Sequence, residues 1–237
     1  MIRRIALFVI AVITQYSLLQ AQEKYSVEFF GALRSTIIEG DISAQADLSE
    51  FMEIENFYAL GAFEDLKGEI LIMGPETYSV RATDGEIAFI DPYTEKANLL
   101  VTATVPEWRE VVLDAGTGSM DELQHSIENI AREEGLNLDE PFPFIIEGSF
   151  KELKWHIIDW PKDDPVHTHQ KHRTSGPHGT IHDQPVKILG FWSDAHHGIF
   201  THHSTNMHLH FVTQDGEVAG HVDGLNDWNE LRIFIPG

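Results

Sequence analysis

The chain has 237 residues, with 16 Lys and Arg against 38 Asp and Glu, a formal net charge of −22, 14 His and no Cys. Nucleic acids and anionic lipids are poor partners for so acidic a chain, because phosphate groups are bound by clustered Lys and Arg. The lack of Cys excludes disulfides, thiolate nucleophiles and Cys-ligated metal sites. With 42% hydrophobic residues the chain can bury a sizeable core, so we expect a folded globular protein.

Residues 1–21 have the three-part layout of a secretory signal peptide. Arg3 and Arg4 give a basic start, the apolar run 5–13 follows, and Ala21 supplies a small residue at the expected cleavage point. Polar residues interrupt the run from Thr14, well short of the roughly 20 apolar residues that a membrane-spanning helix needs. We therefore expect export to the periplasm or the exterior, without membrane association after cleavage.

Between residues 22 and 140 the pattern predicts short strands and one clear helix. The spacing of apolar residues predicts a helix over 43–51. Strands are predicted at 56–62, 69–73, 77–82 and 86–89, and Asp84-Gly85 is a strong hairpin turn between the last two. An amphipathic helix is predicted over 120–134, with Asp121 near its start and Gly135 near its end.

From residue 141 onward strands dominate, and they are predicted at 144–147, 150–158, 186–192, 207–213, 217–222 and 231–235. Asp215-Gly216 predicts a hairpin turn, and the polar stretch 161–184 predicts a long loop. The fold class is therefore α+β, with mainly antiparallel or mixed sheets and few helices. A junction near residue 140 would divide the chain into two similar-sized halves, 22–140 and a β-rich half 141–237.

Histidine is concentrated in the second half, where 13 of the 14 lie between His156 and His221. On a strand over 207–213, His208 and His210 project to one face with Cα atoms ~6.6 Å apart. The hairpin at Asp215-Gly216 can place His221 beside them. Three neutral imidazoles with an open fourth position are typical of a catalytic zinc site. The histidines at 167–182, 196–197 and 202–203 are open to three interpretations: groups that orient the ligands, a substrate wall, or surface residues.

Three segments resemble the α-acetolactate decarboxylase family: 31–41, 60–71 with Leu60-Gly61-Ala62-Phe63-Glu64-Asp65-Leu66-Lys67-Gly68-Glu69, and 190–222 with His208-Leu209-His210 and Gly220-His221. The resemblance covers roughly residues 27–236. It implies that His208, His210 and His221 bind zinc and that Glu69 reaches the zinc site and handles protons. It also implies a small 2-hydroxy-3-oxo acid as substrate and, because the family is commonly dimeric, a homodimer.

The chain departs from the family pattern at three places. Ala62 stands where the family usually has Thr, and the substrate-orienting Arg falls at Ile145 or nearby. The chain ends at Gly237, before the family's second active-site Glu. Because a substrate carboxylate needs a cation to orient it, we expect Arg173, Lys171 or a protonated histidine of the loop to replace the Arg.

The leading prediction is an exported, zinc-dependent decarboxylase that converts 2-acetolactate to acetoin and CO2. Zinc would stabilise the enediolate as a Lewis acid, and Glu69, with a raised pKa, would return a proton to carbon. One alternative is a zinc enzyme on the same scaffold with another small oxo or hydroxy acid as substrate. A second is a non-catalytic periplasmic metal-binding protein whose His-rich loop buffers metal.

Overall fold

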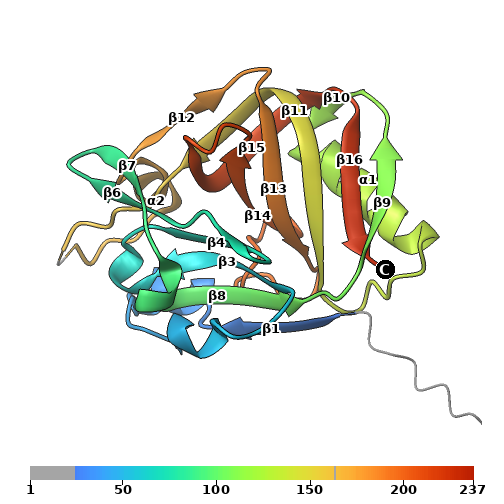
Figure 1. Cartoon of the computed structure of the whole chain (residues 1–237). Helices are drawn as coiled ribbons and strands as arrows, with labels where there is room; N and C mark the ends of the chain where they lie inside the picture. The colour runs from blue at the N-terminus through green and yellow to red at the C-terminus, as the bar shows by residue number, and fades with distance from the viewer. Residues whose placement is uncertain (1–24, 163) are drawn as a thin grey trace, which may run out of the picture.

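The structure is a computed structural model that describes residues 25–162 and 164–237, and it contains two β-sheets (Figure 1). The expected signal segment, residues 1–21, lies outside the described residues. Within the described ranges, no helix is both long enough and apolar enough to cross a membrane.

The first sheet has eight strands in the order β1-β8-β3-β4-β6-β7, with β2 beside β8 and β5 beside β4. Every strand pairing within it is antiparallel. The strands are β1 Ser26–Phe30, β2 Ala46–Asp47, β3 Phe57–Phe63, β4 Glu69–Met73, β5 Glu76–Thr77, β6 Val80–Thr83, β7 Glu86–Phe89 and β8 Lys96–Thr104. The β6–β7 turn has positive φ at Asp84 and Gly85, as the Asp-Gly pair predicts.

The second sheet also has eight strands, in the order β10-β15-β14-β13-β11-β16-β9, with β12 on β11. They are β9 Trp108–Leu113, β10 Gly116–Ser119, β11 Phe142–His156, β12 His178–Ile181, β13 Pro185–Trp192, β14 Met207–Thr213, β15 Ala219–Trp228 and β16 Leu231–Pro236. The long strand β11 pairs with β13 through its first part and with β15 through its last part. Strands β11, β13, β14 and β15 therefore close into a ring.

Two α-helices and four one-turn helices complete the described chain. They are α1 Met120–Glu133 and α2 His169–Thr174, with the short turns η1 Ser35–Glu39, η2 Leu48–Phe51, η3 Glu64–Leu66 and η4 Pro92–Thr94. Ser119 and Glu122 form a capping box at the start of α1, and Gly135 follows its end with a φ of 77°. The predicted helix over 120–134 and the α+β fold class are confirmed.

Two local predictions are wrong. Segment 43–51 forms β2 and the single turn η2, because Ala46–Asp47 pair with β8 and the Asp47 side chain accepts the N–H of Ser49. The predicted loop 161–184 contains α2, which begins after the capping residue Thr168, and β12, which pairs with β11. The chain passes from the first sheet to the second between β8 and β9. Strands β9 and β10 therefore belong to the second sheet, and α1 packs on it, although all three precede residue 140.

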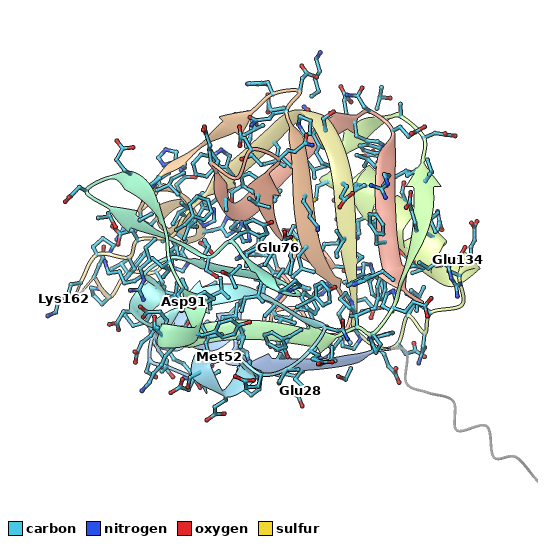
Figure 2. The ribbon with its side chains drawn as sticks, in the orientation of Figure 1. Glu28, Met52, Glu76, Asp91, Glu134 and Lys162 are labelled. Carbon is cyan, nitrogen blue, oxygen red and sulfur yellow. The ribbon has the colours of Figure 1, made fainter. Side chains whose placement is uncertain are left out.

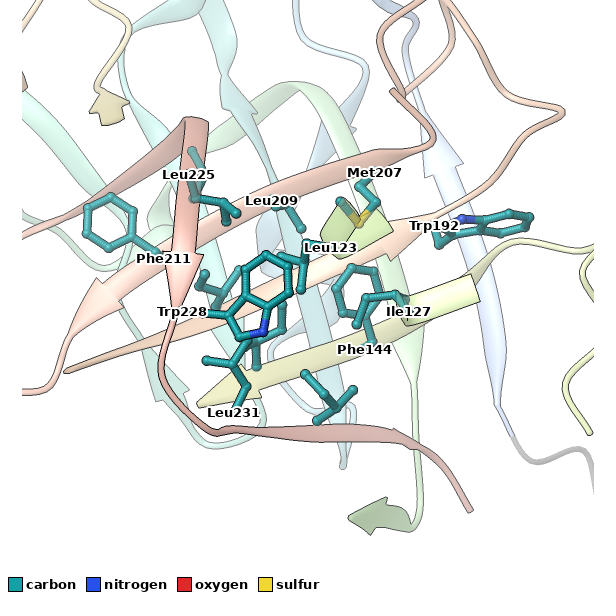
Figure 3. Packing of buried hydrophobic residues seen from close by; sticks show 14 of the residues in the cluster. Leu123, Ile127, Phe144, Trp192, Met207, Leu209, Phe211, Leu225, Trp228 and Leu231 are labelled. Carbon is teal, nitrogen blue, oxygen red and sulfur yellow. The ribbon is translucent and has the colours of Figure 1, made fainter. Parts of the chain in front are cut away.

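The core is layered, and strand alternation assigns each residue to a layer. Leu123 and Ile127 of α1 pack with Phe144, Met207 and Leu209 on one face of the second sheet (Figure 3). The other face of that sheet packs against the first sheet through a separate apolar cluster that includes Leu189, Phe191, Leu71 and Val101. Charged side chains such as Asp91, Glu134 and Lys162 project outward at the rim (Figure 2). Residues that alternate with the α1-facing positions therefore meet the first sheet.

Candidate metal centre and cavity

His208 and His210 lie on β14 with their side chains toward the first sheet. Their neighbours Met207, Leu209 and Phe211 lie in the core cluster beneath α1. His208 is 8% exposed and His210 is fully buried, and their Nε2 atoms lie 3.2 Å apart. Two imidazoles therefore meet edge to edge inside the protein.

His221 joins this pair from the neighbouring strand. It lies directly opposite His210 in the β14–β15 register, which the turn ending at Gly216 makes possible. One ring nitrogen from each of His208, His210 and His221 lies within 4.8 Å of the other two. The structure thus brings together the three residues that the sequence singles out as metal ligands.

The protonation states of these histidines suit a metal. Nδ1 of His210 lies 2.9 Å from the backbone O of Ile70, so a neutral ring donates its proton there and keeps a lone pair on Nε2. Burial lowers the pKa of His208 and of His210 well below the ordinary value. The buried Nδ1 atoms of His208 and His221 have no hydrogen-bond partner among the described residues. Neutral, converging imidazoles fit a divalent transition metal.

Glu69 is the first residue of β4 and faces the histidines across the sheet interface. Its Oε2 lies 3.5 Å from Nε2 of His210, and its Oε1 accepts the N–H of Ile158 at 2.9 Å. Burial raises the pKa of Glu69 to about 7, against the opposing effects of His221 and the Ile158 N–H. The side chain can therefore hold a proton near neutral pH, as a general acid requires.

A cavity of about 400 Å³ opens beside these groups, between the two sheets and α2. This volume lies within the range of about 300–1,000 Å³ that is usual for small-molecule sites. Apolar side chains form much of its wall, among them Leu33, Leu66, Leu99, Phe200 and Val222. Polar groups in the wall include Glu69, His156, His169, Arg173, His202, His208, His221 and Asp223. The site can thus enclose a small polar molecule beside a metal.

Two residues of the cavity, His156 and Asp223, were not singled out from the sequence. Nδ1 of His156 lies 3.0 Å from Oδ1 of Asp223, and Nε of Arg173 lies 3.0 Å from the same oxygen. Burial would raise the pKa of Asp223, but the contacts with His156 and His221 outweigh it and hold this pKa well below its usual range. The pattern His221-Val222-Asp223 could have revealed Asp223, because residues two apart on a strand share a face.

Arg173 and Lys171 are the two side chains expected to replace the family's substrate-orienting Arg. Of these, Arg173 lines the cavity. Lys171 points elsewhere, with its Nζ 2.7 Å from Oδ2 of Asp164 and its side chain 45% exposed. Ile145 packs in the apolar cluster between the sheets and does not line the cavity, whereas Ala62 lines it and lies opposite Glu69 in the β3–β4 register.

The other histidines fall into distinct environments. His167 and His172 lie 3.0 Å apart through Nδ1 and Nε2, and both rings pack on Trp160. His169 and His202 meet at the cavity wall, with ring centroids 4.3 Å apart. Burial lowers the pKa of His172 and of His202 to about 4, so neither supplies a cation at neutral pH. His178 and His182 are exposed and bond to the backbone O atoms of Gly176 and Lys151.

A three-histidine site with an adjacent buried carboxyl, set in a cavity, is typical of a catalytic rather than a structural metal centre. A family model described as alpha-acetolactate decarboxylase matches residues 25–235, so the chain belongs to this family. It is a decarboxylase-type enzyme.

Individual relatives are distant but cover most of the chain. The chain is 24% identical to the alpha-acetolactate decarboxylase of Streptococcus thermophilus, over 86% of this chain and 80% of that protein. It is 26% identical to the enzyme of Klebsiella aerogenes, over 84% of this chain and 70% of that protein. The crystal structure of alpha-acetolactate decarboxylase from Bacillus subtilis strain 168 has the same fold, with a TM-score of 0.67 at 18% identity, covering 88% of this chain and 85% of that one.

The pKa of Glu69 predicts a measurable pH dependence of stability in the metal-free protein. An unfolded Glu ionises near pH 4.5 and Glu69 in the fold near 7, so its stabilising contribution is present below about 4.5 and is lost as the pH rises through about 7. Relative to Glu69→Gln, the wild type should lose up to about 3 kcal/mol of unfolding free energy over this window. Urea denaturation from about pH 5 to about pH 8 measures the difference. A difference that does not change with pH, or one equalled by the exposed control Glu86→Gln, would contradict the buried neutral carboxyl.

Proposed function

We propose that this protein is an exported, zinc-dependent acetolactate decarboxylase that converts 2-acetolactate to acetoin and CO2. The observation that carries the proposal is the convergence of His208, His210 and His221 beside the buried carboxyl of Glu69. Bound by the three imidazoles, zinc would supply Lewis-acid stabilisation of the negative charge that develops on the substrate as CO2 leaves.

Glu69 is the proton donor in this proposal. Loss of CO2 breaks a carbon–carbon bond, and its electron pair passes into the adjacent carbonyl group. Carbon must then receive a proton. Because Oε1 of Glu69 already accepts the Ile158 N–H, the acidic proton belongs on Oε2, which faces His210 and the cavity. Solvent restores the proton after each turnover.

Arg173 is the candidate partner for the substrate carboxylate. It lies on α2 in the cavity wall, with its side chain 32% exposed and its Nε held by Asp223. A guanidinium fixed at one edge can present its other N–H groups to a carboxylate in a defined orientation. Leu33, Leu66 and Phe200 line the same cavity and favour loss of a charged carboxylate as neutral CO2, because apolar surroundings disfavour buried charge.

The alternative of a metal-buffering protein has less support. A buffer needs histidines that are free to bind several ions, but His167 and His172 are engaged with each other and with Trp160. A different small oxo or hydroxy acid as substrate stays open as a second candidate, because the cavity of about 400 Å³ is roomy for 2-acetolactate.

The function is tested by acetoin formation from racemic 2-acetolactate with zinc-loaded protein. The wild type should bind one tight zinc per chain and form acetoin, and His210→Ala should lose both. The variant Gln184→Ala, half-buried and outside the cavity, is the matched control and should behave as wild type. Folded zinc protein without acetoin formation would remove this substrate, and several zinc equivalents that survive in His210→Ala would favour the buffer.

The proposed role of Arg173 predicts that substitutions of Arg173 and of Lys171, both on α2, have different effects on activity. Arg173→Ala should lower kcat/KM by about 10- to 100-fold, because a hydrogen bond to a charged group contributes about 1.5–3 kcal/mol. Lys171→Ala removes the same charge two positions away, outside the cavity wall, and should leave kcat/KM unchanged. Steady-state kinetics at saturating zinc decides the matter. Equal effects of the two substitutions would contradict the assignment.

Export is proposed from residues 1–21 alone. Expression with the full leader should yield a mature protein whose N-terminus is Gln22, recovered outside the cytoplasm. Mass spectrometry of the intact chain gives the cleavage site. A chain that keeps Met1 or Ile2 at its N-terminus in every cell fraction would contradict export.

A further inference from the structure

Asp223 joins three separate segments of the chain. Its Oδ1 lies 3.0 Å from Nδ1 of His156 on β11, 3.0 Å from Nε of Arg173 on α2, and 3.7 Å from Nδ1 of His221 on its own strand β15. The carboxylate side chain is only 6% exposed. A buried carboxylate is held in place only when its oxygens are bonded, and here one oxygen meets all three groups.

The sheet register explains this convergence. His221 and Asp223 are two residues apart on β15, so their side chains share one face. His156, the last residue of β11, lies directly opposite His221, with the two ring centroids 4.9 Å apart. Asp223 is therefore the diagonal neighbour of His156 across the two strands. The helix α2 adds Arg173 from outside the sheet.

Two interpretations of this group are chemically distinct. His156, His221 and Asp223 each offer a ligand atom, all within 4.8 Å, so they could bind a second metal ion that shares His221 with the first. Arg173 argues against that interpretation. Its guanidinium already contacts the oxygen that would bind the ion, and a dication beside it would be repelled.

We propose that Asp223 is a positioning residue for the metal ligand His221, and we rest this on the proposed zinc site. Asp223 accepts the Nδ1–H of His156, forms an ion pair with Arg173, whose Nε lies 3.0 Å away, and faces Nδ1 of His221. At 3.7 Å this contact is electrostatic rather than a hydrogen bond, and it favours the His221 tautomer with its proton on Nδ1, which leaves Nε2 for the metal. A carboxylate behind a metal-bound imidazole also raises the basicity of the ring, and loss of such a partner typically lowers metal affinity by about 10- to 100-fold.

The same carboxylate couples the metal ligand to α2. The Asp223 oxygen that faces His221 also holds Arg173 at the cavity wall. Asp223 therefore positions both the proposed metal ligand and the cation proposed to bind the substrate carboxylate. Removal of Asp223 should therefore weaken zinc binding and substrate binding together. Removal of Arg173 should weaken substrate binding alone.

The test is zinc affinity, measured by competition with a chromophoric chelator. Wild type and Asp223→Asn should each bind one zinc, with the variant about 10- to 100-fold weaker. Glu217→Gln makes the same charge change at an exposed position on the same hairpin and should bind zinc as the wild type does. Cobalt-substituted wild type and Asp223→Asn should have the same visible spectrum, because a positioning residue does not belong to the coordination sphere.

Each contrary result has its own meaning. Equal zinc affinity in wild type and Asp223→Asn would overturn the inference and leave the zinc site intact. A second zinc equivalent that Asp223→Asn loses, or an altered cobalt spectrum, would make Asp223 a ligand and overturn the inference as well. Absence of zinc binding by the wild type would remove the proposed function along with it.

A measurement on the wild type alone guards against a variant that does not fold. In metal-free protein labelled with ¹⁵N-histidine, His156 should carry its proton on Nδ1, because Asp223 is the acceptor at 3.0 Å. Nitrogen shifts distinguish the two tautomers, and His156→Gln identifies the resonance. An Nε2–H tautomer at His156 would overturn the inference.

Discussion

The packing of the two sheets against each other is the constraint on which the site depends. Side chains alternate along β14, so one of its faces packs in the core beneath α1 and the other faces the first sheet. His208 and His210 lie on the face toward the first sheet. The hydrogen bond between Nδ1 of His210 and the Ile70 carbonyl crosses that interface at 2.9 Å. It fixes the ring, its tautomer and its distance from β4. The strand that supplies this carbonyl also supplies Glu69, so the proposed metal ligand His210 and the proposed proton donor Glu69 are placed by a single contact between sheets.

Burial at this interface tunes the chemistry of the residues it holds. Removal from water keeps the rings of His208 and His210 neutral, ready to bind metal, and lets Glu69 keep a proton near neutral pH. Asp223 stays ionised in the same cavity because its contacts with His156 and His221 outweigh burial and hold its pKa well below the usual range. Two carboxyl groups in one cavity are thus driven to opposite states, Glu69 by burial and Asp223 by its histidine partners, which is how acid and base roles are separated in enzymes.

Period-two alternation and Asp-Gly turns made much of this fold predictable. They located β14 and the β6–β7 hairpin, a short apolar run located β4, and the capping pattern located α1. The strand β8 was not predicted, because the sequence of its buried residues 97–103 has no alternation of apolar and polar side chains. The three histidines were within reach of sequence reasoning because two lie on one strand and the third lies across a hairpin. His156 was not, because its position depends on the β11–β15 register, which links residues 65 apart along the chain, as in His156 and His221.

We propose that the sheet interface forms a single zinc site. Anomalous diffraction at the zinc absorption edge, from crystals of the zinc-loaded protein, tests it most directly. We expect one peak among the Nε2 atoms of His208, His210 and His221, on the side that faces Glu69. Zinc bound instead between His156 and Asp223, or only at the exposed His178 and His182, would contradict it.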